Sequence, residues 1–172
     1  MPTIQEYIAT EPILVKSVVG YAIRDGKVLL GLRKKVSNGL GLNLIAGIGG
    51  KVGDQPEFAD ETDYQAMARE MEEERGLVIT KFHKAGTVIF LFPNKPSWSQ
   101  TVTIFVIDEW EGEPQETEAM VPEWYDVNNV PFAQMWEDNS IWLPKILAGE
   151  EITAIFMYNE DNKTIAEYIL ES

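Results

Sequence analysis

The sequence consists mainly of short apolar runs, rich in β-branched residues, that are separated by turn residues and interrupted by two helical patterns. Residues 13–23 and 27–32 are such runs, and Asp25-Gly26 between them is typical of a tight hairpin turn. This order predicts an α+β fold in which a mixed central sheet packs in layers with two helices. Further strands are expected at residues 86–92, 101–107, 123–127, 152–158 and 164–169, and helices at residues 62–75 and 132–148.

Nothing in the chain indicates a linker or an internal repeat, and 172 residues is the length of one domain. We expect residues 1–12 to be a polar N-terminal lead-in and residues 13–172 to form the domain. The chain contains no Cys and a single His, which excludes disulfides, zinc-thiolate sites and multi-His metal sites. Chemistry must therefore come from carboxylates, amines, hydroxyls or a bound ion.

The chain is strongly acidic, with 14 basic and 28 acidic residues and a net charge of −14. This charge argues against nucleic-acid partners and against anionic membranes. No apolar run approaches the ~18 residues of a membrane span, and residues 1–12 lack the basic and apolar segments of a signal peptide. A cytoplasmic protein is expected, as a monomer or alternatively a dimer.

Acidic residues are concentrated on the helix predicted at residues 62–75, which Thr62 is expected to cap and Gly76 to end. On a helical wheel, Glu70, Glu73 and Glu74 are neighbours at i, i+3 and i+4, while Glu72 points away. Like charges at this spacing repel each other, and a hard cation among them would remove the repulsion. A solvated acidic helix face is the alternative. The face packed on the core is expected to consist of Tyr64, Met67, Ala68 and Met71.

A glycine-rich stretch lies upstream of this helix, at residues 47–53. Gly49-Gly50 would allow close backbone approach, and Lys51 would supply a positive charge. The stretch is not a P-loop, because Val52 stands where that motif needs Ser or Thr. A tight turn without a binding role is the alternative.

Together these segments resemble the Nudix box. Gly-Gly-Lys at residues 49–51 is followed by Glu61 and by the run Arg69-Glu70-Met71-Glu72-Glu73-Glu74-Arg75-Gly76-Leu77, which matches the helical half of the box in full. Glu61 lies further from the glycines than the box requires, and an insertion of five residues within residues 53–60 would account for this. The wider sequence is similar to the MutT-like oxidised purine nucleoside triphosphatases of the Nudix family.

The resemblance implies a Nudix α/β/α sandwich and a pyrophosphohydrolase that uses Mg²⁺ or Mn²⁺. Water would attack the diphosphate linkage of a nucleoside triphosphate, such as 8-oxo-dGTP, and release the monophosphate and pyrophosphate. Such an enzyme sanitises the nucleotide pool and so protects DNA. By motif position, Glu70 or Glu74 would activate the water, Arg69 would orient the carboxylates and Lys51 would neutralise phosphate. The metal ligands would be Glu70, Glu73, Glu74 and the Gly50 carbonyl.

The resemblance also implies a base pocket. Trp136 would stack on the base and Asp138 would bind its edge, with Asn139 standing where the family has a second Asp. Ala46 stands where the family has an Asn, and Asn43, three residues earlier, would substitute for it only if the loop is rebuilt. These departures leave the base preference open. The remaining substrate-binding residues would be Phe90 and Arg33.

Two other functions stay open. The substrate could be another nucleoside-diphosphate compound, such as a dinucleoside polyphosphate, a nucleotide sugar or a capped RNA. The domain could instead be a non-catalytic nucleotide-binding regulator, although such a domain would not need the box glutamates, all of which are present here.

Overall fold

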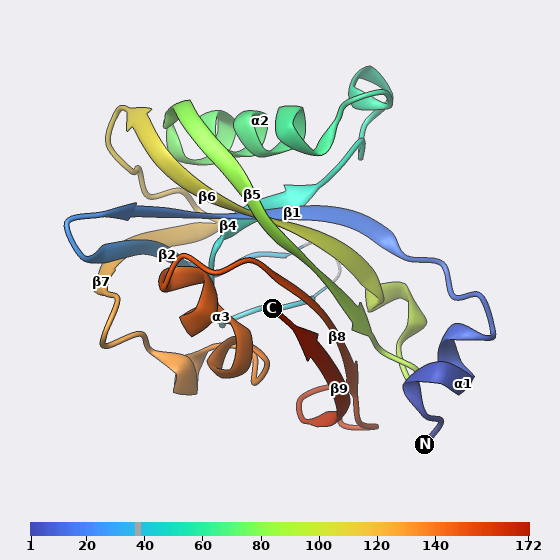
Figure 1. The fold of residues 1–172 in the computed structure, drawn as a ribbon. Helices are drawn as coiled ribbons and strands as arrows, with labels where there is room; N and C mark the ends of the chain where they lie inside the picture. The colour runs from blue at the N-terminus through green and yellow to red at the C-terminus, as the bar shows by residue number, and fades with distance from the viewer. Residues whose placement is uncertain (37–38) are drawn as a thin grey trace.

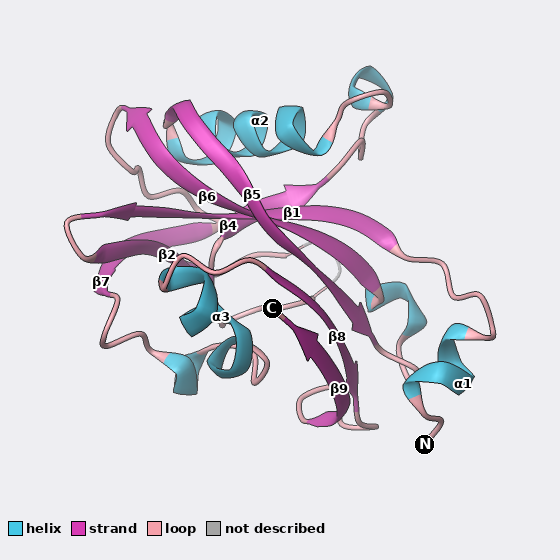
Figure 2. Ribbon diagram, viewed as in Figure 1, coloured by secondary structure: helices cyan, strands magenta, loops and turns pink. Residues whose placement is uncertain are grey.

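The computed structural model describes residues 1–36 and 39–172, without the side chains of Glu74 and Arg75. Its helices lie in layers on a central mixed sheet, with α2 on one face and α3 on the other (Figures 1 and 2). The helices are α1 (Ile4–Ile8), α2 (Asp63–Arg75) and α3 (Asn139–Leu147). The strands are β1 (Val15–Arg24), β2 (Lys27–Arg33), β3 (Ile45–Ala46), β4 (Ile48–Lys51), β5 (Val78–Leu91), β6 (Gln100–Glu111), β7 (Met120–Asp126), β8 (Ile152–Tyr158) and β9 (Ile165–Glu171).

The sheet of the described residues has the strand order β3-β2-β1-β6-β5-β8-β9, with β4 paired to β1 and β7 paired to β2. The pairs β1–β6 and β5–β8 are parallel, and the others are antiparallel. The predicted α+β fold with a mixed sheet is therefore confirmed. Among the described residues, no helix is long and apolar enough to span a membrane.

Two hydrophobic cores lie on opposite sides of the sheet, because side chains along a strand alternate between its faces. On β1, Val18 and Ala22 belong to the core beneath α2, whereas Tyr21 belongs to the core that includes Trp142 of α3. α1 lies within the predicted lead-in, and its Ile4 is buried with Leu91 and Met157.

Local signals in the sequence correctly placed the boundaries of α2 and of the first hairpin. Thr62 and Gln65 form a reciprocal capping box, and Gly76 ends α2 in the left-handed region with φ 67°. Asp25 and Gly26 both have positive φ, as the tight turn between β1 and β2 requires.

The expected buried face of α2 was wrong in part. Ala66, Met67 and Met71 are fully buried, whereas Tyr64 is 48% exposed, although its ring contacts those of Phe82 and Phe105. The small Ala66 lets α2 approach the sheet closely, so the buried arc is rotated towards that residue. The rotation also brings Glu70 into the buried face, where it is 5% exposed.

The helix expected at residues 132–148 is divided. A 3-10 turn occupies Phe132–Gln134, and α3 begins only at Asn139. Pro144 lies inside α3. Asp138 stands at the N-cap but makes no side-chain capping bond, because its carboxylate is used elsewhere.

The glycine-rich stretch is not a simple turn, since it contains β4, which pairs with β1. A Cβ on Gly49 would lie 1.9 Å from the Val18 carbonyl oxygen, so glycine is needed for this close approach of the strands. β5 and β6 are longer than expected, because the apolar runs mark only the parts of these strands that are buried.

Candidate active site

Glu70 is the buried carboxylate of the site. It projects from the sheet-facing side of α2 towards Gly50 of β4, and a Cβ on residue 50 would lie 2.4 Å from Glu70 Oε1. The carboxylate thus occupies space that any other residue at position 50 would fill. Both residues line the main cavity of the described structure.

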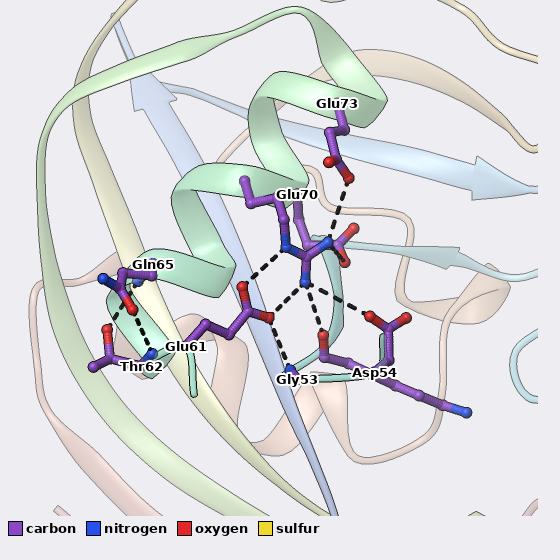
Figure 3. Close-up of polar contacts among 9 residues, drawn as sticks. Gly53, Asp54, Glu61, Thr62, Gln65, Glu70 and Glu73 are labelled. Atoms are coloured by element: carbon purple, nitrogen blue, oxygen red, sulfur yellow. Dashed lines mark hydrogen bonds and ion pairs between the residues drawn. The ribbon is translucent and has the colours of Figure 1, made fainter. Parts of the chain in front are cut away.

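Arg69 lies at the centre of a network of carboxylates (Figure 3). Its Nε donates to Glu61 Oε2 at 3.0 Å and its Nη2 donates to Glu61 Oε1 at 2.7 Å, a bidentate pair. Nη1 donates to Glu70 at 3.1 Å and to Glu73 at 3.3 Å. The hydrogen bond with Glu61 is the main cause of the raised pKa of Arg69, and it lowers the pKa of Glu61.

The inserted segment at residues 53–60 contributes to the same network. The Gly53 amide donates to Glu61 at 2.8 Å, and Asp54 Oδ1 lies 3.9 Å from Arg69 Nη2. The Phe58 ring lies 4.4 Å from the Arg69 guanidinium carbon. The segment at residues 53–60 therefore packs around the Arg69 side chain, and Arg69 remains part of α2.

The predicted metal ligands are placed unequally. Glu70 and Glu73 meet at one nitrogen of Arg69, but the Glu73 side chain is 55% exposed and does not line the cavity. Glu74 is on α2, and its side chain lies outside the described residues.

The cavity has a volume of about 460 Å³, within the usual range for small-molecule sites. It runs along β1, with Ser17 opposite Lys51 and Tyr21 four residues further on. At ~3.3 Å per residue the two positions are about 13 Å apart. Of the residues predicted from the sequence, the cavity is lined by Arg33, Ala46, Gly50, Lys51, Glu70, Phe90, Trp136, Asp138 and Asn139.

Trp136 is held at the aromatic end of the cavity by edge-to-face contacts. Its ring centroid lies 5.7 Å from that of Phe92, 6.3 Å from that of Trp98 and 5.4 Å from that of Tyr158. These contacts restrict the indole to one orientation, which suits a rigid stacking surface. Trp142 is 3% exposed and belongs to the hydrophobic core, and its side chain also lines the cavity.

Asp138 is buried at the same end, 1% exposed, and both of its carboxylate oxygens accept hydrogen bonds. Trp142 Nε1 donates to Oδ2 at 2.7 Å, and the Tyr158 hydroxyl donates to Oδ1. Burial raises the pKa of Asp138 to about 6, although both hydrogen bonds act in the opposite direction. Asn139 follows it, and its amide nitrogen donates to the Trp136 carbonyl at 3.2 Å.

The acidic end of the cavity has the charge that a divalent cation needs. A single guanidinium faces four carboxylates there, from Asp54, Glu61, Glu70 and Glu73, and carboxylate oxygens are the ligands that Mg²⁺ prefers. The described side chains alone include no set of three His, Cys, Asp or Glu residues arranged to hold a metal. The charge and the donor chemistry of these carboxylates fit a hard cation held partly by substrate.

Sequence reasoning did not single out several cavity residues, among them Asp54, Tyr21 and Tyr158. Asp54 lies in the insertion, and its acidic character was the only signal available. Tyr21 and Tyr158 end up at the aromatic end through the pairing of β1 and β8 with other strands, which no local pattern indicates.

Comparisons with known proteins identify the family of the chain and relatives of similar sequence and fold. The NUDIX domain family matches residues 14–146. Oxidized purine nucleoside triphosphate hydrolase of Danio rerio is 36% identical over 149 residues, covering 87% of this chain and 89% of that protein. The Mus musculus protein of the same name is 36% identical over 148 residues, 86% of this chain and 88% of that protein. The fold is similar to that of MutT from Bacillus halodurans, with a TM-score of 0.73 and 21% identity over 92% of this chain and 98% of that one.

Proposed function

The chain belongs to the Nudix family, and we propose on this basis that it hydrolyses an oxidised or modified purine nucleoside triphosphate to the monophosphate and pyrophosphate. Such a reaction removes damaged nucleotides from the pool used for DNA synthesis. The observation that carries the proposal is a single cavity with a carboxylate network at one end and a fixed indole at the other.

The distance along β1 agrees with a nucleotide bound lengthwise. The base would stack on Trp136, and the phosphates would lie near Lys51 and Glu70. The β1 positions Ser17 and Tyr21, which both line the cavity, are about 13 Å apart along the strand. Arg33 also lines the cavity and would add positive charge for the phosphates. Phe90, Asp138 and Asn139 would complete the surroundings of the base.

Nudix hydrolases generally depend on a divalent metal, and we assign Mg²⁺ or Mn²⁺ to Glu70, Glu73, Glu74 and the Gly50 carbonyl. When bound, such an ion neutralises phosphate charge and makes water more acidic. Glu70 or Glu74 would take the proton from the attacking water. Arg69, held by Glu61, would keep the carboxylates of Glu70 and Glu73 in place.

The test is a panel of substrates incubated with the full chain and Mg²⁺ and scored by product. The panel consists of 8-oxo-dGTP, 2-hydroxy-dATP, dGTP, dATP, ADP-ribose, a dinucleoside polyphosphate and capped RNA. We expect pyrophosphate and a monophosphate from the oxidised purines, at higher kcat/KM than from dGTP or dATP, and no turnover with EDTA.

Other outcomes would overturn the proposal. Cleavage of only the dinucleoside polyphosphate, ADP-ribose or capped RNA would assign a different substrate, and binding without turnover would indicate a regulatory domain. A monomeric, cytoplasmic enzyme that binds no nucleic acid belongs to the same proposal, and light scattering during size-exclusion chromatography tests the monomer.

A further inference from the structure

The buried carboxylate of Asp138 has an unusual pair of partners that the proposed reaction does not itself use. The Trp142 indole on α3 donates to Oδ2, and the Tyr158 hydroxyl at the end of β8 donates to Oδ1. Asp138 is 1% exposed, Tyr158 is 0% exposed, and all three residues line the cavity.

The two partners favour the ionised form of this carboxyl group. An indole N–H can only donate, so Oδ2 must remain an acceptor. The Tyr158 hydroxyl, which could also accept, donates to Oδ1 here. A carboxylate offers about four lone-pair sites, so capacity to accept remains for a ligand in the cavity.

The surroundings otherwise favour the neutral form. Burial raises the pKa of Asp138, and the neighbouring Glu137 raises it further. Tyr21 on β1 is buried nearby with its own pKa raised, first by burial and then by Asp138, while Arg33 on β2 acts on Tyr21 in the opposite direction. The two hydrogen bonds to Asp138 therefore oppose the effect of its burial.

We propose that Tyr158 is a positioning residue whose hydroxyl, together with the Trp142 indole, keeps Asp138 as a carboxylate at the aromatic end of the cavity. The pocket then presents a hydrogen-bond acceptor in a fixed position, and it binds the edge of a nucleobase that carries N–H donors. The identification of the ligand as a nucleobase rests on the proposed function, but the ionisation state of Asp138 does not.

The first test uses the free protein. A ¹³C NMR titration of the Asp138 carboxyl, assigned with Asp138→Asn, should give a higher pKa in Tyr158→Phe, by about one to two pH units for one lost charge-assisted hydrogen bond. Phenylalanine keeps the ring that stacks on Phe92 with centroids 4.8 Å apart, so the fold should be retained.

Two further variants make the titration specific. Tyr168→Phe on β9 removes a hydroxyl from a side chain that is 48% exposed and outside the cavity, and it should leave the titration unchanged. Trp142→Phe removes the other donor and should shift the pKa in the same direction. An unchanged pKa in folded Tyr158→Phe would overturn the proposal, as would an equal shift in Tyr168→Phe.

The second test uses turnover of the best substrate in the panel. KM should rise as the pH falls through the pKa of Asp138, and Tyr158→Phe should move this rise to higher pH with kcat unchanged. In an Asp138→Asn background, Tyr158→Phe should not change the pH dependence of KM. If the wild type cleaves no purine nucleotide, the proposed function fails, whereas the NMR titration still decides the role of Tyr158.

Discussion

Glu70 occupies a position on α2 where the helix otherwise presents apolar side chains to the sheet. Its neighbours on that face, Ala66, Met67 and Met71, are fully buried. A buried carboxylate lowers stability unless it is paired, and Arg69 supplies a hydrogen bond at 3.1 Å. A carboxylate at this buried position is better explained by a chemical role than by packing.

Substitution of Glu70 tests this directly. Glu70→Gln should lower kcat by at least about a hundredfold. The variant loses a proposed metal ligand and a candidate general base, and general base catalysis alone contributes roughly 10²- to 10⁴-fold. The fold should persist, as judged by circular dichroism. Glu72→Gln is the matched control, because Glu72 is exposed on the opposite side of α2. Equal activity of the two variants would contradict the assignment.

Trp136 is the residue expected to recognise the base by stacking. Trp136→Ala should raise KM for purine substrates about 5- to 150-fold, because stacking contributes ~1–3 kcal/mol per base. Trp136→Phe should have an intermediate KM, since it keeps a smaller aromatic surface. Steady-state kinetics measure both, and an unchanged KM in Trp136→Ala would exclude the stacking role.

At the scale of elements, α2 and β4 are fitted to each other. The capping box of Thr62 and Gln65 fixes where α2 begins, and Ala66 lets it approach the sheet. Gly50 on β4 then leaves room for the Glu70 carboxylate. The acidic end of the cavity therefore depends on how a helix and a strand pack together.

Gly50→Ala should separate activity from stability. Its Cβ would lie 2.4 Å from Glu70 Oε1, at the end of a side chain that can move, so we expect kcat to fall at least about tenfold with only a small loss of stability. Gly20→Ala on β1 is the control, because its Cβ would meet the flexible Met67 Sδ at 2.9 Å and not the site. Equal effects on kcat would refute the role given to Gly50.

At the scale of the whole molecule, Glu61 connects the inserted segment to α2. It accepts from the Gly53 amide and from Arg69, and its side chain is 7% exposed. Hydrogen bonds from Arg69 lower its pKa, so the unfolded chain binds its proton more readily than the folded one. The stability that Glu61 contributes is present above its unfolded pKa and is lost as the pH falls through its folded pKa.

Glu61→Gln should therefore reduce the free energy of unfolding at pH 7 by about 1–3 kcal/mol, the range for hydrogen bonds to charged groups. The difference from the wild type should shrink as the pH falls below about 4. Urea unfolding across the pH range measures this. Glu57→Gln, an exposed residue in the same segment, controls for the loss of one charge. A pH-independent difference would contradict the linkage.

The sequence was informative wherever a conformation depends on near neighbours. Thr62 and Gly76 mark the ends of α2, and Asp25-Gly26 marks the first turn, because capping and positive φ are decided within a few residues. The order of apolar runs likewise predicted the mixed sheet. The spacing of the box residues, with the family resemblance, identified nine of the residues that line the cavity, including Glu70, Lys51 and Trp136.

What the sequence by itself determined is thus the set of elements and the residues capable of chemistry. Only the tertiary structure decided that Tyr64 is half-exposed, that a separate 3-10 turn precedes α3, and that Tyr158 meets Asp138 twenty residues away. The reason is that burial and long-range hydrogen bonds depend on how close α2 lies to the sheet and on which strands are paired. Those distances are set by packing of the whole chain, and no local run of residues encodes them.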